Sequence, residues 1–157
     1  MKRFTLILYL LFLFFIQEAF AQNPAYIREK EYEGFSFPRE FILQGFPPSP
    51  NRYTLKNIDI FQAEEIIHQT PLYFTTNRNP CERKRIRLSK YYRQYVGYIE
   101  KNTHILVHIY FIHKAIIKEH ELLNDLIIVL DGGNYYWEAI VDITAKKIIS
   151  IKQTGYG

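Results

Sequence analysis

The chain has 157 residues, of which 48% are hydrophobic and 23% charged, and its 20 Lys and Arg residues outnumber 16 Asp and Glu residues, for a formal charge of +4. Charged side chains at this density exclude a polytopic membrane protein. The apolar content, without long Gly, Pro or Ser tracts, excludes a mainly disordered chain. This length predicts one small domain.

The N-terminus has the three parts of a secretory signal peptide. Lys2 and Arg3 supply a positive start, residues 6–16 form an unbroken apolar run, and residues 19–21 (Ala-Phe-Ala) fit the small-x-small cleavage rule. Such a run covers only about half of a hydrocarbon core about 30 Å thick, which argues against a membrane anchor. We therefore predict a signal peptide over residues 1–21, cleavage after Ala21, and a secreted or periplasmic mature chain.

Proline interrupts every regular pattern between residues 22 and 56. Pro24, Pro38 and residues 46–50 (Phe-Pro-Pro-Ser-Pro) each break a run that could otherwise become a helix or a central strand. The stretch predicts an extended arm, rich in proline and aromatic residues, with some strand character at residues 41–43. The α+β domain would then occupy residues 57–157.

Residues 58–69 carry the pattern of one short amphipathic helix. Asn57 or Asp59 can cap its start, and Pro71 ends it because the ring restricts Thr70 and offers no amide proton. The apolar residues recur at offsets of three and four: Ile60, Ala63, Ile66 and Ile67.

Cys81 is the only cysteine, so the chain cannot form an intramolecular disulfide and must be stabilised by packing. As a nucleophile it would need a nearby imidazole, and as an intermolecular partner it would need exposure. The plainer interpretation is an incidental thiol in an Asn-Pro-Cys-Glu stretch.

Residues 83–99 fit a helix at some spacings and a strand at others. We predict strand because β-branched and aromatic residues dominate the second half of this run. A polar turn at residues 101–103 separates it from a second strand-like run over residues 104–112, in which alternate side chains are apolar. Together the two runs predict an antiparallel hairpin.

The last third predicts three consecutive antiparallel strands: residues 126–130, 134–143 and 147–153. Gly132 and Gly133 form the tight turn between the first two. The predicted fold class is α+β, with one short helix packed on a four-stranded antiparallel β-meander. One face of the sheet would wrap around the helix and the other would stay half polar.

Two aromatic segments stand out in the second half: residues 92–98 (Tyr-Arg-Gln-Tyr-Val-Gly-Tyr) and residues 131–137 (Asp-Gly-Gly-Asn-Tyr-Tyr-Trp). With the Ile-rich strand and Gly155 that follow, they resemble small exported proteins of Bacteroidetes-type bacteria. The resemblance implies a compact exported module and supplies no catalytic residue. The order of helix and meander also resembles the cystatin-like fold, which hosts unrelated functions.

The resemblance to cystatins raises protease inhibition as a minor hypothesis. Inhibitory cystatins insert a Gln-x-Val-x-Gly hairpin tip into the target's cleft. Residues 94–97 (Gln-Tyr-Val-Gly) are one residue short of this pattern and fall inside a predicted strand instead of at a tip.

A basic segment precedes and enters the predicted hairpin, with seven cations within 16 residues: Arg78, Arg83, Lys84, Arg85, Arg87, Lys90 and Arg93. Cations interleaved with aromatics suit single-stranded nucleic acid, but export argues against that partner. An acidic glycan, an anionic lipid surface or an envelope protein fits better. The predicted binding residues are Arg83, Arg85, Arg87, Lys90, Tyr92, Arg93 and Tyr95. The alternative is a solvated strand face whose charges discourage aggregation.

The titratable residues give no catalytic or metal pattern. His104 and His108 would lie about 13 Å apart along a strand, too far to chelate one ion, and Glu138 and Asp142 have no partner identifiable by spacing. We therefore predict no metal, no cofactor and no catalytic residues. The leading hypothesis is an exported non-enzymatic module that binds an envelope partner or polyanion through a basic, Tyr-rich sheet surface. The alternative is a small periplasmic enzyme with a cleft between helix and sheet.

Overall fold

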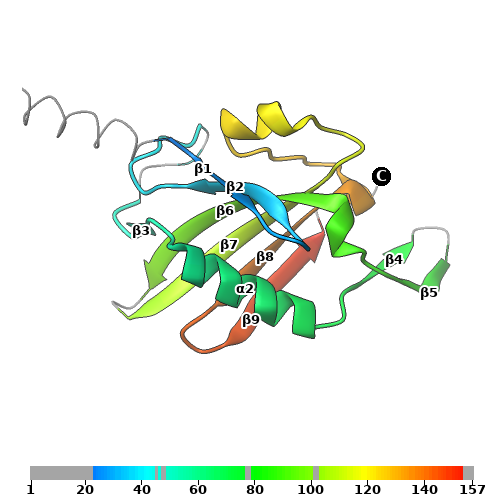
Figure 1. Cartoon of the computed structure of the whole chain (residues 1–157). Coiled ribbons are helices and arrows are strands. Elements are labelled where there is room, and N and C mark those ends of the chain that lie inside the picture. The colour runs from blue at the N-terminus through cyan, green and yellow to red at the C-terminus, as the bar shows by residue number, and fades with distance from the viewer. Residues whose placement is uncertain (1–22, 45, 47–48, 77–78, 101–102, 154–157) are drawn as a thin grey trace, which may run out of the picture.

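The computed structural model describes residues 23–44, 46, 49–76, 79–100 and 103–153, with side chains left out of the description over residues 74–84. It is an α+β structure in which one α-helix packs on a mostly antiparallel sheet of seven strands (Figure 1). The predicted signal peptide lies outside the described residues. Within the part of the chain that the structure describes, no helix is long and apolar enough to cross a membrane.

The strands of the main sheet follow the spatial order β1-β2-β6-β7-β8-β9, and β3 pairs with β6 beyond the end of β2. Only the pairing of β2 with β6 is parallel. A separate two-stranded sheet, β4–β5, projects beyond the C-terminal end of the helix (Figure 1). The bounds are β1 Ala25–Arg28, β2 Glu33–Phe37, β3 Arg52–Tyr53, β4 Tyr73–Thr76, β5 Asn79–Arg85, β6 Tyr91–Glu100, β7 His104–His113, β8 Tyr136–Asp142 and β9 Lys147–Gln153.

Helix α2 spans Asn57–Gln69, which confirms the helix predicted over residues 58–69. Its start is fixed by Asp59, whose carboxylate accepts a hydrogen bond of 2.8 Å from the backbone N–H of Lys56. Asn57 is the first helical residue and not the cap. The helix ends where Thr70 turns to an extended conformation ahead of Pro71.

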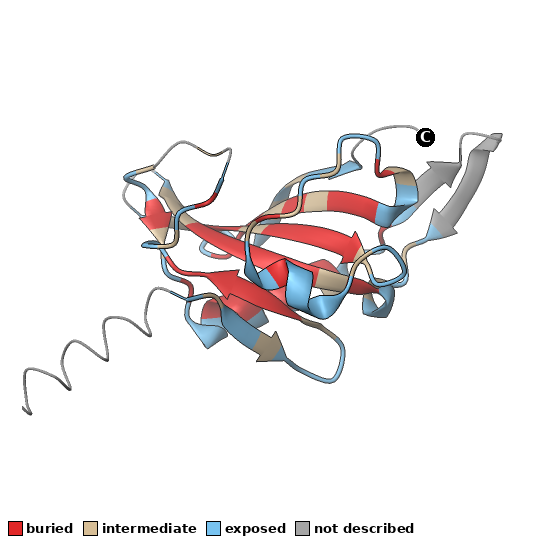
Figure 2. Cartoon of the chain, turned by 90° about the horizontal axis from the view of Figure 1, so that it is seen from above, coloured by how far each residue is buried: buried red, intermediate tan, exposed pale blue. Residues whose placement is uncertain are grey.

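Hydrophobic side chains fill both faces of the main sheet. On the α2 face, Ile60 and Ile67 of the helix pack against the sheet residues Tyr95 and Phe111 and form a continuous hydrophobic core. On the opposite face the sheet is covered by the loop residue Leu43 and by residues 122–129. Figure 2 shows the resulting burial along the central strands. The predicted half-polar face is therefore wrong over β2, β6 and β7, whereas Glu138 of β8 and its partner Lys152 of β9 keep this face polar at the other side of the sheet.

Residues 126–130 form an irregular segment and not the predicted strand. The position beside β7, where the predicted strand would have followed the hairpin, is occupied by β8, and β9 pairs with the other edge of β8. The buried side chain of Gln94 substitutes for a strand partner. Its Nε2 donates to the carbonyls of Leu122 and Asp125 at 2.9 and 2.7 Å, and its Oε1 accepts from the N–H of Ile127 at 2.8 Å.

The predicted strand count was too low because residues 22–56 contribute β1, β2 and β3 to the main sheet. The described prolines, Pro24, Pro38 and Pro50, lie outside these strands, where no ladder hydrogen bond is lost. Gly34 of β2 pairs with Arg93 of β6, and a Cβ at this position would overlap the Arg93 carbonyl. Residues 41–43 form no strand.

The hairpin of β6 and β7 confirms the predicted antiparallel pairing, with a register running from Tyr91–His113 to Glu100–His104. The preceding basic segment is not one continuous strand with β6. Its first part belongs to β5, and a short 3₁₀ helix, η1 (Leu88–Lys90), separates the two strands. Arg78 and the side chain of Cys81 lie outside the described residues, so the predictions made for them stay predictions.

Candidate functional site

A concavity of about 1030 Å³ lies between the β1–β2 turn, the C-terminal end of α2 and the chain that links β5 to β6. We call it the basic hollow. Glu31 is the one carboxylate in its wall. The positively charged or protonatable side chains that line it are Lys30, His68, Arg85, Arg87, Lys90 and His113.

Three cations of the basic hollow have no ion-pair partner among the side chains that the structure describes, whereas His68 contacts Glu31 and Glu64. Arg85, Arg87 and Lys90 are exposed, and none of the three forms an ion pair with a described side chain. Like charges held close without partners repel one another and attract an anion. The hollow is therefore a region of positive potential.

One wall of the basic hollow is aromatic. The ring of His113 makes edge-on contacts with Tyr91 and Tyr135, at centroid distances of 5.1 and 5.2 Å. Burial and, after it, the nearby charge of Lys90 lower the pKa of His113, which keeps this imidazole neutral near pH 7. The hydroxyl of Tyr91 donates a 2.6 Å hydrogen bond to the carbonyl of Asn134 and fixes its ring.

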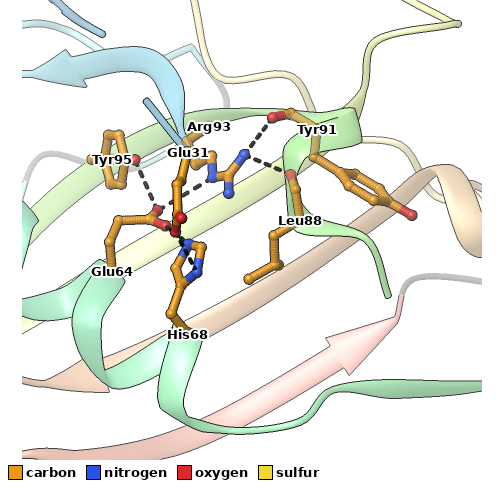
Figure 3. A network of polar contacts seen from close by, with 7 residues as sticks. All are labelled: Glu31, Glu64, His68, Leu88, Tyr91, Arg93 and Tyr95. Carbon is orange, nitrogen blue, oxygen red and sulfur yellow. Dashed lines mark hydrogen bonds and ion pairs between the residues drawn. The ribbon is translucent and has the colours of Figure 1, made fainter. Parts of the chain in front are cut away.

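A buried ion pair between Arg93 and Glu64 lies next to the residues that line the hollow (Figure 3). Arg93 of β6 is fully buried, and its Nε lies 3.3 Å from Oε1 of Glu64, which extends from α2. Tyr95 donates a 2.9 Å hydrogen bond to the same oxygen. Arg93 Nη1 also donates to the carbonyls of Leu88, at 2.8 Å, and Tyr91. Arg93 thus ties η1, which carries Lys90, to the sheet and the helix.

His68 connects this buried network to the surface. Its Nδ1 lies 3.1 Å from Oε2 of Glu31, and its Nε2 lies 3.5 Å from Oε2 of Glu64 (Figure 3). The contact with Glu64, aided by Glu31 and opposed by partial burial and Arg93, raises the pKa of His68. Burial acts to raise the pKa of Glu64, but Arg93 and the hydrogen-bonded neighbours outweigh it and lower that pKa.

The structure separates the seven predicted binding residues. Arg85, Arg87 and Lys90 converge on the basic hollow. Arg93 and Tyr95 are buried, so they are not part of a binding surface, and both contact Glu64 in the interior. Tyr92 points to the opposite face, where Lys114 Nζ lies 5.2 Å from its ring centroid.

The seventh predicted residue, Arg83, belongs to β5, and its side chain is not described. The set does not form one surface on the main sheet, because Arg85 belongs to the separate β4–β5 sheet and the cations that follow it lie in the link to β6. Sequence reasoning missed Lys30, His68 and His113, which no spacing rule connects to the basic segment.

The remaining titratable residues lie apart from the hollow. His104 Nδ1 is 2.7 Å from Oδ2 of Asp142, and Asp142 Oδ1 accepts from the N–H of Ala145 at 2.8 Å, so this pair closes the β8–β9 turn. His108 packs against Tyr98 instead. Among the residues described, no three His, Cys, Asp or Glu side chains are placed to hold a metal ion.

No protein-family model, curated protein or solved structure matches the chain. The candidate site is therefore defined by its geometry and charge alone. Residues 94–97, weighed above as an inhibitory motif, lie in the middle of β6, which is paired on both edges. Gln94 and Val96 are buried there, so this segment has no free tip to insert into a cleft.

Proposed function

We propose that the protein is an exported, non-enzymatic module that binds an acidic partner in the basic hollow. The observation that carries the proposal is the convergence of unpaired cations from separate parts of the chain. Lys30 comes from the β1–β2 turn, Arg85 from β5, and Arg87 and Lys90 from the link to β6. Arginine forks bind carboxylate, sulfate or phosphate groups through paired hydrogen bonds.

The shape of the hollow favours an acidic glycan over a flat lipid surface. A concave site holds a chain of sugar rings, whereas a membrane would contact only its rim. The aromatic wall of Tyr91, His113 and Tyr135 offers flat apolar surfaces beside the cations. Export argues against nucleic acid, and an acidic envelope protein would use the same cations.

Charge reversal in the hollow tests the proposal. Wild type should elute from heparin resin at clearly higher salt than the Arg85→Glu/Arg87→Glu variant, because binding through several charges weakens steeply with ionic strength. Lys147→Glu/Lys152→Glu is the matched control, since it makes the same change in net charge at exposed residues of β9. Binding of the same proteins to anionic phosphatidylglycerol vesicles tests a lipid surface as the partner.

Retention on heparin that both double variants lose equally would show a general charge effect and contradict the hollow as the site. Retention on vesicles but not on heparin would replace the glycan with a lipid surface. Unchanged melting curves for both variants are expected, because all four side chains are exposed.

Export is part of the same proposal and rests on the signal peptide pattern of residues 1–21. Every helix and strand described lies within residues 25–153, so the predicted cleavage removes none of them. N-terminal sequencing of the protein recovered from the periplasm or the medium should begin at Gln22. A chain retained in the cytoplasm with Met1 in place would contradict export.

A further inference from the structure

A second concavity of about 430 Å³ adjoins the basic hollow and has the opposite charge. It shares Lys30, Glu31 and His68 with the hollow and continues along the exposed side of α2. We call it the acidic pocket. Its remaining carboxylates are Glu29, Glu64 and Glu65, and its aromatic side chains are Tyr32 and Phe61.

The two aromatic side chains are placed to contact a ligand. Phe61 is 54% exposed, although it lies on a helix whose other face is buried in the core. Tyr32 is half-buried, and burial followed by the charges of Glu64 and Glu29 raises its pKa. Both carboxylates line the same pocket as this ring. The acidic pocket therefore combines aromatic rings and carboxylates in one wall.

One carboxylate oxygen of the acidic pocket is buried without a hydrogen bond, and two exposed carboxylates have no ion-pair partner among the described side chains. Glu64 has only 2% of its side chain exposed, and its Oε2 accepts no hydrogen bond, although it lies 3.5 Å from Nε2 of His68. Glu29 and Glu65 form no ion pair with a described side chain.

The cations that face this pocket do not neutralise it. Arg93 balances Glu64 from the core side. His68 contacts both Glu31 and Glu64, and Lys30 is the one lysine in the wall. Two carboxylates, those of Glu29 and Glu65, remain without a counter-ion, so the pocket favours a positively charged ligand.

We propose that the acidic pocket binds an organic cation, an alkylammonium or guanidinium group. Such a group gains from the face of an aromatic ring and from a carboxylate at once, and its alkyl part covers the exposed ring of Phe61. A small inorganic cation would gain little from the apolar part of the wall. The two sites share Lys30, Glu31 and His68, but the test of this proposal rests on Phe61 and Glu65, which line the acidic pocket and not the basic hollow.

Backbone amide NMR of the ¹⁵N-labelled protein tests this site. Agmatine and n-butylammonium represent a free amine, and N-acetyl-arginine amide represents an arginine side chain of a peptide. Saturable shifts should appear at Tyr32, Phe61 and residues 65–69. Phe61→Ala should weaken binding roughly threefold to tenfold through loss of the cation–π contact. Glu65→Gln should also weaken it through loss of a free carboxylate.

Ile58→Ala is the matched control, since Ile58 is 55% exposed on the same helix but does not line the acidic pocket. It should bind like wild type. Tighter binding of the free amines would indicate a small-molecule ligand, and tighter binding of N-acetyl-arginine amide would indicate an arginine side chain of a peptide. The proposal is overturned if potassium chloride at equal ionic strength produces the same shifts, or if Phe61→Ala and Glu65→Gln both bind as wild type does.

Discussion

Arg93 joins three parts of the molecule through one guanidinium group. It contacts Glu64 of α2, the carbonyls of Leu88 and Tyr91, and the face of the Phe111 ring, whose centroid lies 5.2 Å from its Cζ. Burying a charge this completely is unfavourable unless a counter-ion and hydrogen bonds compensate it. The basic segment predicted from the sequence as a binding surface thus includes one arginine whose role is to position the others.

Removing this arginine alone should be costly. Arg93→Met should lower the free energy of unfolding by about 3–5 kcal/mol, because Glu64 would remain as an uncompensated buried carboxylate. The Arg93→Met/Glu64→Gln variant should recover part of that loss, since a neutral amide still accepts from Tyr95. Urea unfolding followed by the fluorescence of Trp137 measures both.

Equal destabilisation in the single and double variants would contradict this account. It would mean that the loss comes from the packing of Arg93 and not from the buried charge of Glu64. The single variant Glu64→Gln serves as the control, because it keeps the hydrogen bond from Tyr95 and removes only the negative charge.

At the scale of elements, periodic patterns were predictable from the sequence and positions in the sheet were not. Helix α2 and the β6–β7 hairpin each bury a regular set of side chains, so their patterns identify them. Residues 126–130 have an equally apolar pattern, but β8 pairs with the edge of β7 where this segment was expected. Which segment pairs with an edge depends on the whole chain.

The sequence also predicted one part of the candidate site and missed another part. Arg85, Arg87 and Lys90 were identified because they are close in sequence and unusually dense in charge. His68 and Lys30 lie on α2 and the β1–β2 turn, and only the folded sheet brings them to the same hollow. No local sequence pattern indicates that residues so far apart in the chain line the same hollow.

The turn before β8 depends on two glycines for different reasons. Gly133 has a φ of 51°, so Gly133→Ala should cost about 1–2 kcal/mol, whereas Gly133→Asn should cost less because asparagine tolerates this conformation better. Gly132 has an ordinary φ of −71°, but a Cβ there would lie 2.5 Å from Cβ of Tyr136. Denaturant melts of Gly133→Ala and Gly133→Asn measure the difference, and equal stabilities would place the strain elsewhere.

For the whole molecule, both proposed sites lie at one end of the fold and not over the middle of the sheet. The basic hollow and the acidic pocket meet at the C-terminal part of α2, where His68 contacts Glu31 between them. The central strands are left with structural roles. Their buried titratable groups then determine how the stability of the whole molecule depends on pH.

Stability should fall on mild acidification because His108 is held neutral. Burial lowers the pKa of His108 to about 4, and no carboxylate opposes that effect. With an unfolded pKa of about 6.5, the unfolded state binds more protons between pH 6.5 and 4. The stability from His108 is therefore complete above pH 6.5 and is lost towards pH 4, by roughly 3 kcal/mol in total.

Two other histidines, His113 and His68, also make the stability depend on pH. His113 has a lowered pKa and adds a loss of the same sign below pH 6.5. His68 has a raised pKa, so its contribution is complete below pH 6.5 and fades as the pH rises through its folded value. The two directions place the maximum of stability near neutral pH.

A His108→Gln variant separates His108 from the other groups. Unfolding free energies from urea titrations at pH 7.5, 6.5, 5.5 and 4.5 should decline for the wild type over the lower three values and decline much less for the variant. The carboxylates with lowered pKa, such as Glu64 and Asp142, lose their contributions only as the pH falls further. Parallel pH profiles for the two proteins would show that His108 is hydrated in the folded state and that another group carries the loss.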